Sequence, residues 1–234
     1  PRDRRQRQMC IRDSLKTFDH VLIPDCVYGS ARRFAEEEFK RFQIEHDYYN
    51  PRDLSNLESK IKKNTKVIYL ESPGSYTFEI IDINKTVKLA KKHKIITIID
   101  NTWGTALYFN AIKFGVDIVV EAITKYIGGH SDVMMGVTVC NKKHLNSIIR
   151  WKRNSGQCVG PDDIFLALRG LRTLPLRLEK SQKNSIKLAN FLSNQKEVKK
   201  VYHPALKEHP DHKLWKRDFN GACGIFGIEF KDYI

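Results

Sequence analysis

The sequence lacks long hydrophobic runs, because no apolar stretch of its 234 residues approaches the roughly 18 that a membrane-spanning helix needs. It also lacks paired cysteines: the five cysteines are an odd number, no CxxC motif occurs, and no secretory leader precedes them. A disulfide framework and a zinc site are therefore not expected, and we predict a reduced, cytoplasmic protein without a membrane span or a metal. His203, His209 and His212 lie among prolines and lysines, which predicts a loop.

Acidic residues are comparatively few, with 27 Asp and Glu against 41 Lys and Arg, giving a formal net charge of +14. Such a surplus is typical of nucleic-acid-binding proteins. Part of it, however, is concentrated in arginines of the first 13 residues, and the rest is dispersed, mostly as lysine. Dispersed charge without a basic stripe argues against nucleic-acid binding.

Residues 1–14 have no helical or strand periodicity, and the chain does not begin with Met. They fit either a flexible basic arm or a non-native leader joined to a truncated frame. We favour the leader and leave this stretch out of the fold prediction.

From residue 15 onward, segments of helical and strand character alternate, and several strands are apolar almost throughout. Strands buried on both faces are typical of a parallel sheet covered by helices. The sequence therefore predicts an α/β domain over residues 15–174. A boundary near residues 172–175 and the start of a second domain over 175–234 are also expected. Strands are expected at 21–24, 44–48, 66–71, 95–99, 116–121, 133–140 and 224–230, and helices at 30–42, 53–63, 83–93, 142–153, 162–171 and 176–192.

In such sheets the ligand site lies at the carboxyl ends of the strands, which singles out Asp100 and Lys125. The two residues fit a salt bridge at the rim of the sheet. They also fit a site for pyridoxal phosphate (PLP), which needs a lysine for its aldehyde and an acid beside its ring nitrogen. Thr124 offers a hydroxyl for the phosphate, and the glycines at 128 and 129 permit a close approach of the backbone. The residues alone leave both interpretations open.

Longer sequence motifs favour the PLP site over the salt bridge. The segments LESPGSYTFEI (70–80), IIDNTWGTALYF (98–109), ITKYIGGHSDVMMG (123–136), RGLRTLPLRL (169–178) and HPAL…HKLWKRDFNGACGIF (203–226) resemble the Cys/Met-metabolism family of PLP-dependent enzymes. The resemblance covers about residues 18–234. It implies the large domain of PLP-dependent transferase fold type I, with a mostly parallel, seven-stranded-type sheet flanked by helices. The start of a smaller α+β C-terminal domain would follow.

The resemblance also implies roles for individual residues. Lys125 matches the lysine that forms the Schiff base and removes the substrate Cα proton, and Asp100 matches the partner of the pyridine nitrogen. Thr124 matches a phosphate-binding hydroxyl. Tyr28, in CVYGS, aligns with the tyrosine that stacks on the cofactor ring and takes part in proton transfer. Ala122 stands where many members have a serine, so one phosphate hydrogen bond is lost.

The words ESPGS and IDNTW are those of the β-lyases, where γ-lyases, γ-synthases and sulfhydrylases usually read ETPTNP and VDNTF. The implied reaction is α,β-elimination of L-cystathionine to homocysteine, pyruvate and ammonia, a step of transsulfuration in methionine biosynthesis. A γ-lyase or γ-synthase of the family is the alternative enzyme. An inactive relative and a basic nucleic-acid-binding protein are the alternatives outside it.

Compared with the family, the chain looks truncated at both ends. The resemblance implies a homotetramer, a dimer of dimers with shared sites, for the full-length protein. We expect the chain by itself to be inactive.

Overall fold

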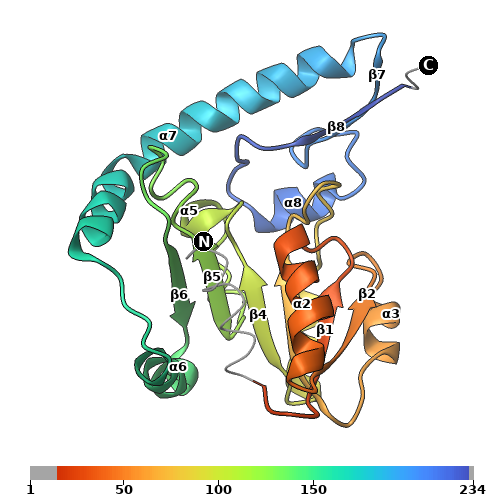
Figure 1. Cartoon of the computed structure of the whole chain (residues 1–234). Coiled ribbons are helices and arrows are strands. Elements are labelled where there is room, and N and C mark those ends of the chain that lie inside the picture. The colour runs from red at the N-terminus through yellow and green to blue at the C-terminus, as the bar shows by residue number, and fades with distance from the viewer. Residues whose placement is uncertain (1–14, 232–234) are drawn as a thin grey trace.

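The computed structural model describes residues 15–231, so the leader predicted for residues 1–14 lies outside the described part. Helices and strands alternate along the chain, as Figure 1 shows. The strands are β1 (His20–Pro24), β2 (Glu45–Tyr49), β3 (Thr65–Glu71), β4 (Ile96–Asp100), β5 (Ile118–Ala122), β6 (Gly136–Cys140), β7 (Val198–Tyr202) and β8 (Gly227–Phe230). The helices are α2 (Gly29–Arg41), α3 (Leu54–Ser59), α4 (Ile83–Lys92), α5 (Thr105–Tyr108), α6 (Lys142–Asn154), α7 (Pro161–Ser193) and α8 (His212–Asp218).

Six of the described strands form one sheet in the order β2-β1-β3-β4-β5-β6. The first five are parallel, and β6 pairs with β5 in the antiparallel sense. This confirms the predicted mostly parallel sheet flanked by helices, with six strands in the described residues. β7 and β8 form a separate antiparallel pair, which lies with α8 beyond one end of the large sheet in Figure 1.

The sheet is buried on both faces, which accounts for its apolar strands. On one face, α2 packs through Ala35 and Phe39 against Val67 and Ile98. On the other face, side chains of α3, α4 and α8 join Ile68 and Ile99 in a second cluster. Alternate residues of one strand therefore enter opposite cores. A strand that enters two cores has to be apolar at nearly every position, which is the pattern that predicted a parallel sheet.

α7 differs from the prediction of two helices separated near residues 172–175. It is a single helix of 33 residues with Pro175 inside it. The proline removes one backbone hydrogen bond, and Figure 1 shows the helix changing direction along its length. Leu174 and Leu178 are buried on either side of Pro175, and their packing offsets the cost of the proline. Within residues 15–231, neither α7 nor any other helix is long and apolar enough to cross a membrane.

The region after α7 also contains elements that the sequence did not predict. β7 is a five-residue strand with two exposed lysines, and α8 is a seven-residue helix that follows a proline-rich turn. Both are too short for a clear period. They matter for function because β8, paired to β7, reaches the edge of the site described next.

Candidate active site

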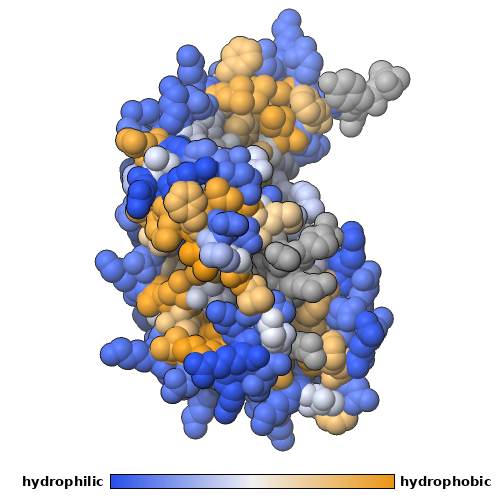
Figure 2. Space-filling view, turned by 60° about the vertical axis from the view of Figure 1, so that its left-hand side comes forward, coloured by the Kyte–Doolittle hydropathy of each residue, from blue (hydrophilic) through white to orange (hydrophobic). Residues whose placement is uncertain are grey.

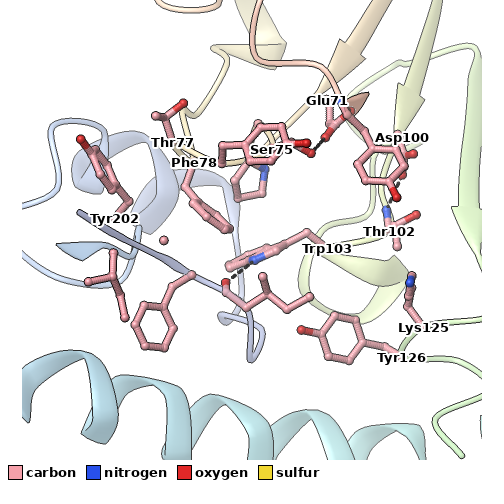
Figure 3. Close-up of a pocket in the computed structure, with 18 of the residues that line it drawn as sticks. Glu71, Ser75, Thr77, Phe78, Asp100, Thr102, Trp103, Lys125, Tyr126 and Tyr202 are labelled. Carbon is pink, nitrogen blue, oxygen red and sulfur yellow. Dashed lines mark hydrogen bonds between the residues drawn. The ribbon is translucent and has the colours of Figure 1, made fainter. Parts of the chain in front are cut away.

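A pocket of about 710 Å³ opens at the carboxyl ends of the central strands. Glu71 ends β3, Asp100 ends β4 and Lys125 follows β5, and all three line this pocket. Its other walls come from the loop at residues 73–78 and from residues 225–229, which lead into and form most of β8. The site therefore lies where parallel-sheet topology predicts it, and Figure 3 shows its side chains.

Asp100 lines the pocket and is buried. Asp100 is 5% exposed, and its Oδ1 accepts a 2.9 Å hydrogen bond from the backbone N–H of Thr102. In the β3–β4 register Asp100 stands opposite Glu71, so the tips of two neighbouring strands each carry a carboxylate. A buried carboxylate that faces a pocket is suited to holding a positively charged or protonated group of a ligand.

Lys125 is positioned by a turn at the end of β5. Its backbone N–H donates to the carbonyl of Ala122 at 3.1 Å, and its own carbonyl accepts from Gly129 at 2.9 Å. The residue is exposed and lines the pocket together with Asp100. Figure 3 shows both residues at the same end of the pocket.

Thr124 is not among the residues that line the pocket. Its hydroxyl donates to the carbonyl of Met135 at 3.2 Å and accepts from the N–H of the same residue at 3.0 Å. The phosphate-binding role of Thr124 therefore stays a prediction, and it requires the hydroxyl to give up its hydrogen bond to Met135.

The glycines at 128 and 129 have a packing role in this structure. A Cβ on Gly128 would lie 2.6 Å from Val133 Cγ1, and Gly129 has a φ of +72°, which favours glycine. Arg177 from α7 packs against Gly129 and donates to the carbonyl of Tyr126 at 2.5 Å. The expectation that these glycines bring the backbone close to a phosphate stays a prediction. In this structure they allow a tight contact between α7 and the turn that contains Lys125.

Glu71, the last residue of β3, is a further residue of the site. Its Oε2 accepts a 2.9 Å hydrogen bond from the backbone N–H of Tyr28, and its Oε1 accepts a 2.6 Å bond from Ser75 Oγ. Tyr28 is 40% exposed and lines the pocket at the start of α2. The buried carboxylate of Glu71 therefore ties the predicted stacking tyrosine to the loop that forms another wall.

Glu121, in β5, is a third buried carboxyl, and it does not line the pocket. Its Oε1 accepts a 3.0 Å hydrogen bond from Asn101 Nδ2, and the residue is 6% exposed. The pKa of Glu121 is raised to about 7, chiefly by burial and also by the negative charge of Asp100, while the hydrogen bond from Asn101 opposes the shift. Glu121 therefore titrates in the folded protein near neutral pH.

This shift predicts a pH-dependent stability. The unfolded pKa of a glutamate is about 4.3, so between that pH and about 7 the folded state binds the proton more tightly. The contribution of Glu121 to folding stability is fully present below the unfolded pKa. It falls as the pH rises to about 7, by about 4 kcal/mol in total, at about 1.4 kcal/mol per pH unit. Glu121→Gln, which keeps an acceptor for Asn101, is expected to remove this slope.

Denaturant unfolding at pH 5 and pH 8 measures the effect of Glu121→Gln. We expect the variant to exceed the wild type in stability at pH 8 but not at pH 5. Glu37→Gln, at an exposed position of α2, serves as the matched control and should leave the slope intact. An unchanged slope in Glu121→Gln would show that Glu121 does not titrate in this range.

The residues present fit PLP at two of its groups. An amine for the aldehyde (Lys125) and a buried carboxylate for the ring nitrogen (Asp100) open into one pocket, and an aromatic ring (Tyr28) lines it as well. The volume of the pocket falls within the range of small-molecule and cofactor sites. Within residues 15–231, no three His, Cys, Asp or Glu side chains are grouped so as to hold a metal ion.

Solved structures share this architecture. The crystal structure of cystathionine gamma-lyase from Lactobacillus plantarum, complexed with L-serine, superposes with a TM-score of 0.92 at 31% identity. The match covers 96% of this chain and 60% of that one.

Curated relatives match over nearly the whole chain. A putative cystathionine beta-lyase of Saccharomyces cerevisiae is 44% identical over 93% of this chain and 64% of its own length. The cystathionine beta-lyase of Haemophilus influenzae is 42% identical, over 92% of this chain and 55% of its own length. An L-alanine/L-glutamate racemase of Wolbachia pipientis is also 42% identical, over 91% and 52%. The chain thus spans about half to two thirds of the length of these relatives.

A family model supplies the last comparison. The model of the Cys/Met metabolism PLP-dependent enzymes matches residues 7–234, which include Asp100, Lys125 and every wall of the pocket. With the fold and the pocket geometry in agreement, the chain belongs to the Cys/Met metabolism family of PLP-dependent enzymes.

Proposed function

We propose that the intact protein is a PLP-dependent carbon–sulfur lyase that cleaves L-cystathionine by α,β-elimination to homocysteine, pyruvate and ammonia. The observation that carries this proposal is the common pocket of Lys125 and Asp100, which is also lined by residues of the ESPGS and IDNTW motifs. The names of the relatives at 42% and 44% identity support the β-lyase assignment. The γ-lyase and racemase matches define the competing activities.

The side chains of the pocket suit the proposed proton transfers. Bound PLP supplies an electron sink for the electron pair left at the substrate Cα. Lys125 Nζ takes the proton from Cα, and the Asp100 carboxylate holds a proton on the ring nitrogen. As the Cβ–S bond breaks, the electron pair of that bond leaves with sulfur, which is protonated to give homocysteine. The released 2-aminoacrylate takes up water and yields pyruvate and ammonia.

Tyr28 is assigned the ring-stacking role and a share in proton transfer. It lines the pocket with Lys125, and Glu71 holds its backbone. A second proton-transfer group also makes racemisation chemically accessible, because a proton removed by one group and returned on the opposite face by the other inverts Cα. The racemase name of the Wolbachia relative favours this as the second candidate.

Product analysis with L-cystathionine tests the proposal. We expect the PLP-loaded intact protein to release pyruvate and homocysteine, with Lys125→Ala as the inactive control. β-Elimination moves a single carbon-bound proton, whereas γ-cleavage requires a further proton shift at Cβ and yields 2-oxobutyrate and cysteine. Release of 2-oxobutyrate would contradict the proposal in favour of a γ-lyase. Conversion of L-alanine to D-alanine without a keto acid would identify a racemase.

We also propose that the intact protein assembles as a homotetramer built from two dimers. Figure 2 shows apolar side chains gathered on the face formed by α6, α7 and β6. On α7, Phe165 is 66% exposed and Leu168 is 55% exposed, which is unusual for large apolar residues in a monomer. Light scattering measures the assembly directly: four copies per particle would support the proposal, and a monomer would contradict it.

A cytoplasmic location is proposed as well. The four cysteines in the described residues are all free, which supports a reducing compartment.

A further inference from the structure

One wall of the pocket is tied to the sheet by hydrogen bonds over a long sequence separation. Trp103 lies three residues beyond the end of β4, in the turn after Asn101, and its Nε1 donates to the carbonyl of Ile225 at 2.9 Å. Both residues line the pocket, and Figure 3 shows this hydrogen bond. The indole therefore joins the end of β4 to residues 221–226, the segment that leads into β8.

The same segment is held at two further points. The thiol of Cys223 contacts the carbonyl oxygen of Trp103, and the N–H of Gly224 donates to Tyr126 Oη at 2.9 Å. Trp103 therefore makes contacts with two residues of this segment. These contacts hold the wall at residues 225–228 from one side, and the pairing of β7 with β8 also supports it.

Trp103 also lies between two ends of the pocket. Figure 3 shows Lys125 and Asp100 on one side of the indole and Tyr202 and Phe78 on the other. The first end contains Lys125 and Asp100, the residues proposed to act in C–S cleavage. The second is lined by aromatic rings and by Glu229, whose carboxylate accepts from Tyr202 Oη at 2.6 Å. A substrate bound at Lys125 must pass Trp103 to reach the second end.

We propose that Trp103 is a specificity-determining residue, which fixes the wall at Ile225 so that the far end of the pocket receives the distal half of a long amino-acid substrate. This inference rests on the proposed C–S lyase function. A short substrate such as S-methyl-L-cysteine has no distal half to place at the far end of the pocket. Its turnover therefore depends little on the wall. L-Cystathionine extends into the far end and depends on it.

Trp103→Phe tests the proposal, because phenylalanine keeps an aromatic ring and loses the N–H. A neutral hydrogen bond contributes about 1 kcal/mol net, equivalent to about a fivefold change. We expect the KM for L-cystathionine to rise about fivefold to tenfold with kcat within about twofold. The kcat/KM for S-methyl-L-cysteine should stay within about twofold. An equal loss for both substrates, or no loss for either, would overturn the proposal.

Trp215→Phe is the matched control. Its Nε1 donates to the carbonyl of Gly221 at 3.1 Å, at the other end of the same segment, and Trp215 does not line the pocket. This variant loses the same chemical group and should leave the selectivity between the two substrates unchanged. A selectivity change as large as that of Trp103→Phe would show general loosening of the segment, and would overturn a specific role for Trp103.

Hydrogen–deuterium exchange of the PLP-loaded protein separates this inference from the proposed function. Peptides covering residues 225–228 should exchange several-fold faster in Trp103→Phe than in the wild type or in Trp215→Phe. If the wild type cleaves neither substrate, the proposed function fails, and exchange still decides whether Trp103 holds the wall. Unchanged exchange in Trp103→Phe would overturn the anchor itself.

Discussion

Replacing Lys125 by alanine is expected to abolish the visible absorbance of protein-bound PLP and to lower C–S cleavage by about 10³-fold or more. The expectation follows from the position of Lys125, which lines the same pocket as the buried Asp100. Alanine removes both the covalent attachment of the cofactor and the base for the Cα proton. Absorbance spectroscopy and single-turnover kinetics on the intact protein measure the two losses separately.

Lys143→Ala is the control for the lysine substitution, since Lys143 is exposed in the first turn of α6, outside the pocket. It should keep both the absorbance band and the turnover. A retained band in Lys125→Ala would remove Lys125 from the attachment role. A retained turnover rate would remove it from the role of the base.

Replacing Asp100 by asparagine is expected to lower turnover by about 10²-fold or more and to weaken PLP binding. Asparagine keeps the shape of the side chain and an acceptor for the N–H of Thr102, and it removes the negative charge. Without that charge the ring nitrogen is not held in its protonated form, and the ring accepts electrons less readily. Steady-state kinetics and a PLP titration of the apo protein measure both effects.

Glu71→Gln provides the comparison for Asp100→Asn, because Glu71 is the neighbouring carboxylate in the β3–β4 register. It removes a charge of the same sign from the same pocket. We expect a loss of less than about tenfold, arising from weaker hydrogen bonds to Tyr28 and Ser75. Equal losses in the two variants would indicate that the total charge of the pocket matters, and would contradict a specific role for Asp100.

The parallel sheet was predictable because its strands enter two cores. A run such as VIYL in β3 has no polar face, so burial on both sides follows from composition alone. The same argument placed Asp100 and Lys125 at one end of the sheet. Periodicity left open whether they form a salt bridge or a cofactor site, and the resemblance of the longer words favoured the cofactor.

Other parts of the site carry no sequence signal. The hydrogen bond between Trp103 and Ile225 joins residues 122 positions apart, and no local pattern predicts it. The contacts of Thr124 with Met135 and of Gly129 with Arg177 likewise arise from tertiary packing. At Pro175 the prediction of a break between two helices was wrong, because buried leucines on both sides of the proline keep α7 continuous. We propose that the boundary between the large domain and the start of the C-terminal domain, near residues 174 and 175, lies within this helix.

Trapping the cofactor tests the central claim most directly. Sodium borohydride reduces the bond between the PLP aldehyde and a lysine to a stable secondary amine, and mass spectrometry of the digested protein identifies the labelled residue. The account predicts a phosphopyridoxyl group on Lys125. A label on a different lysine, or no label on PLP-treated protein, would contradict it.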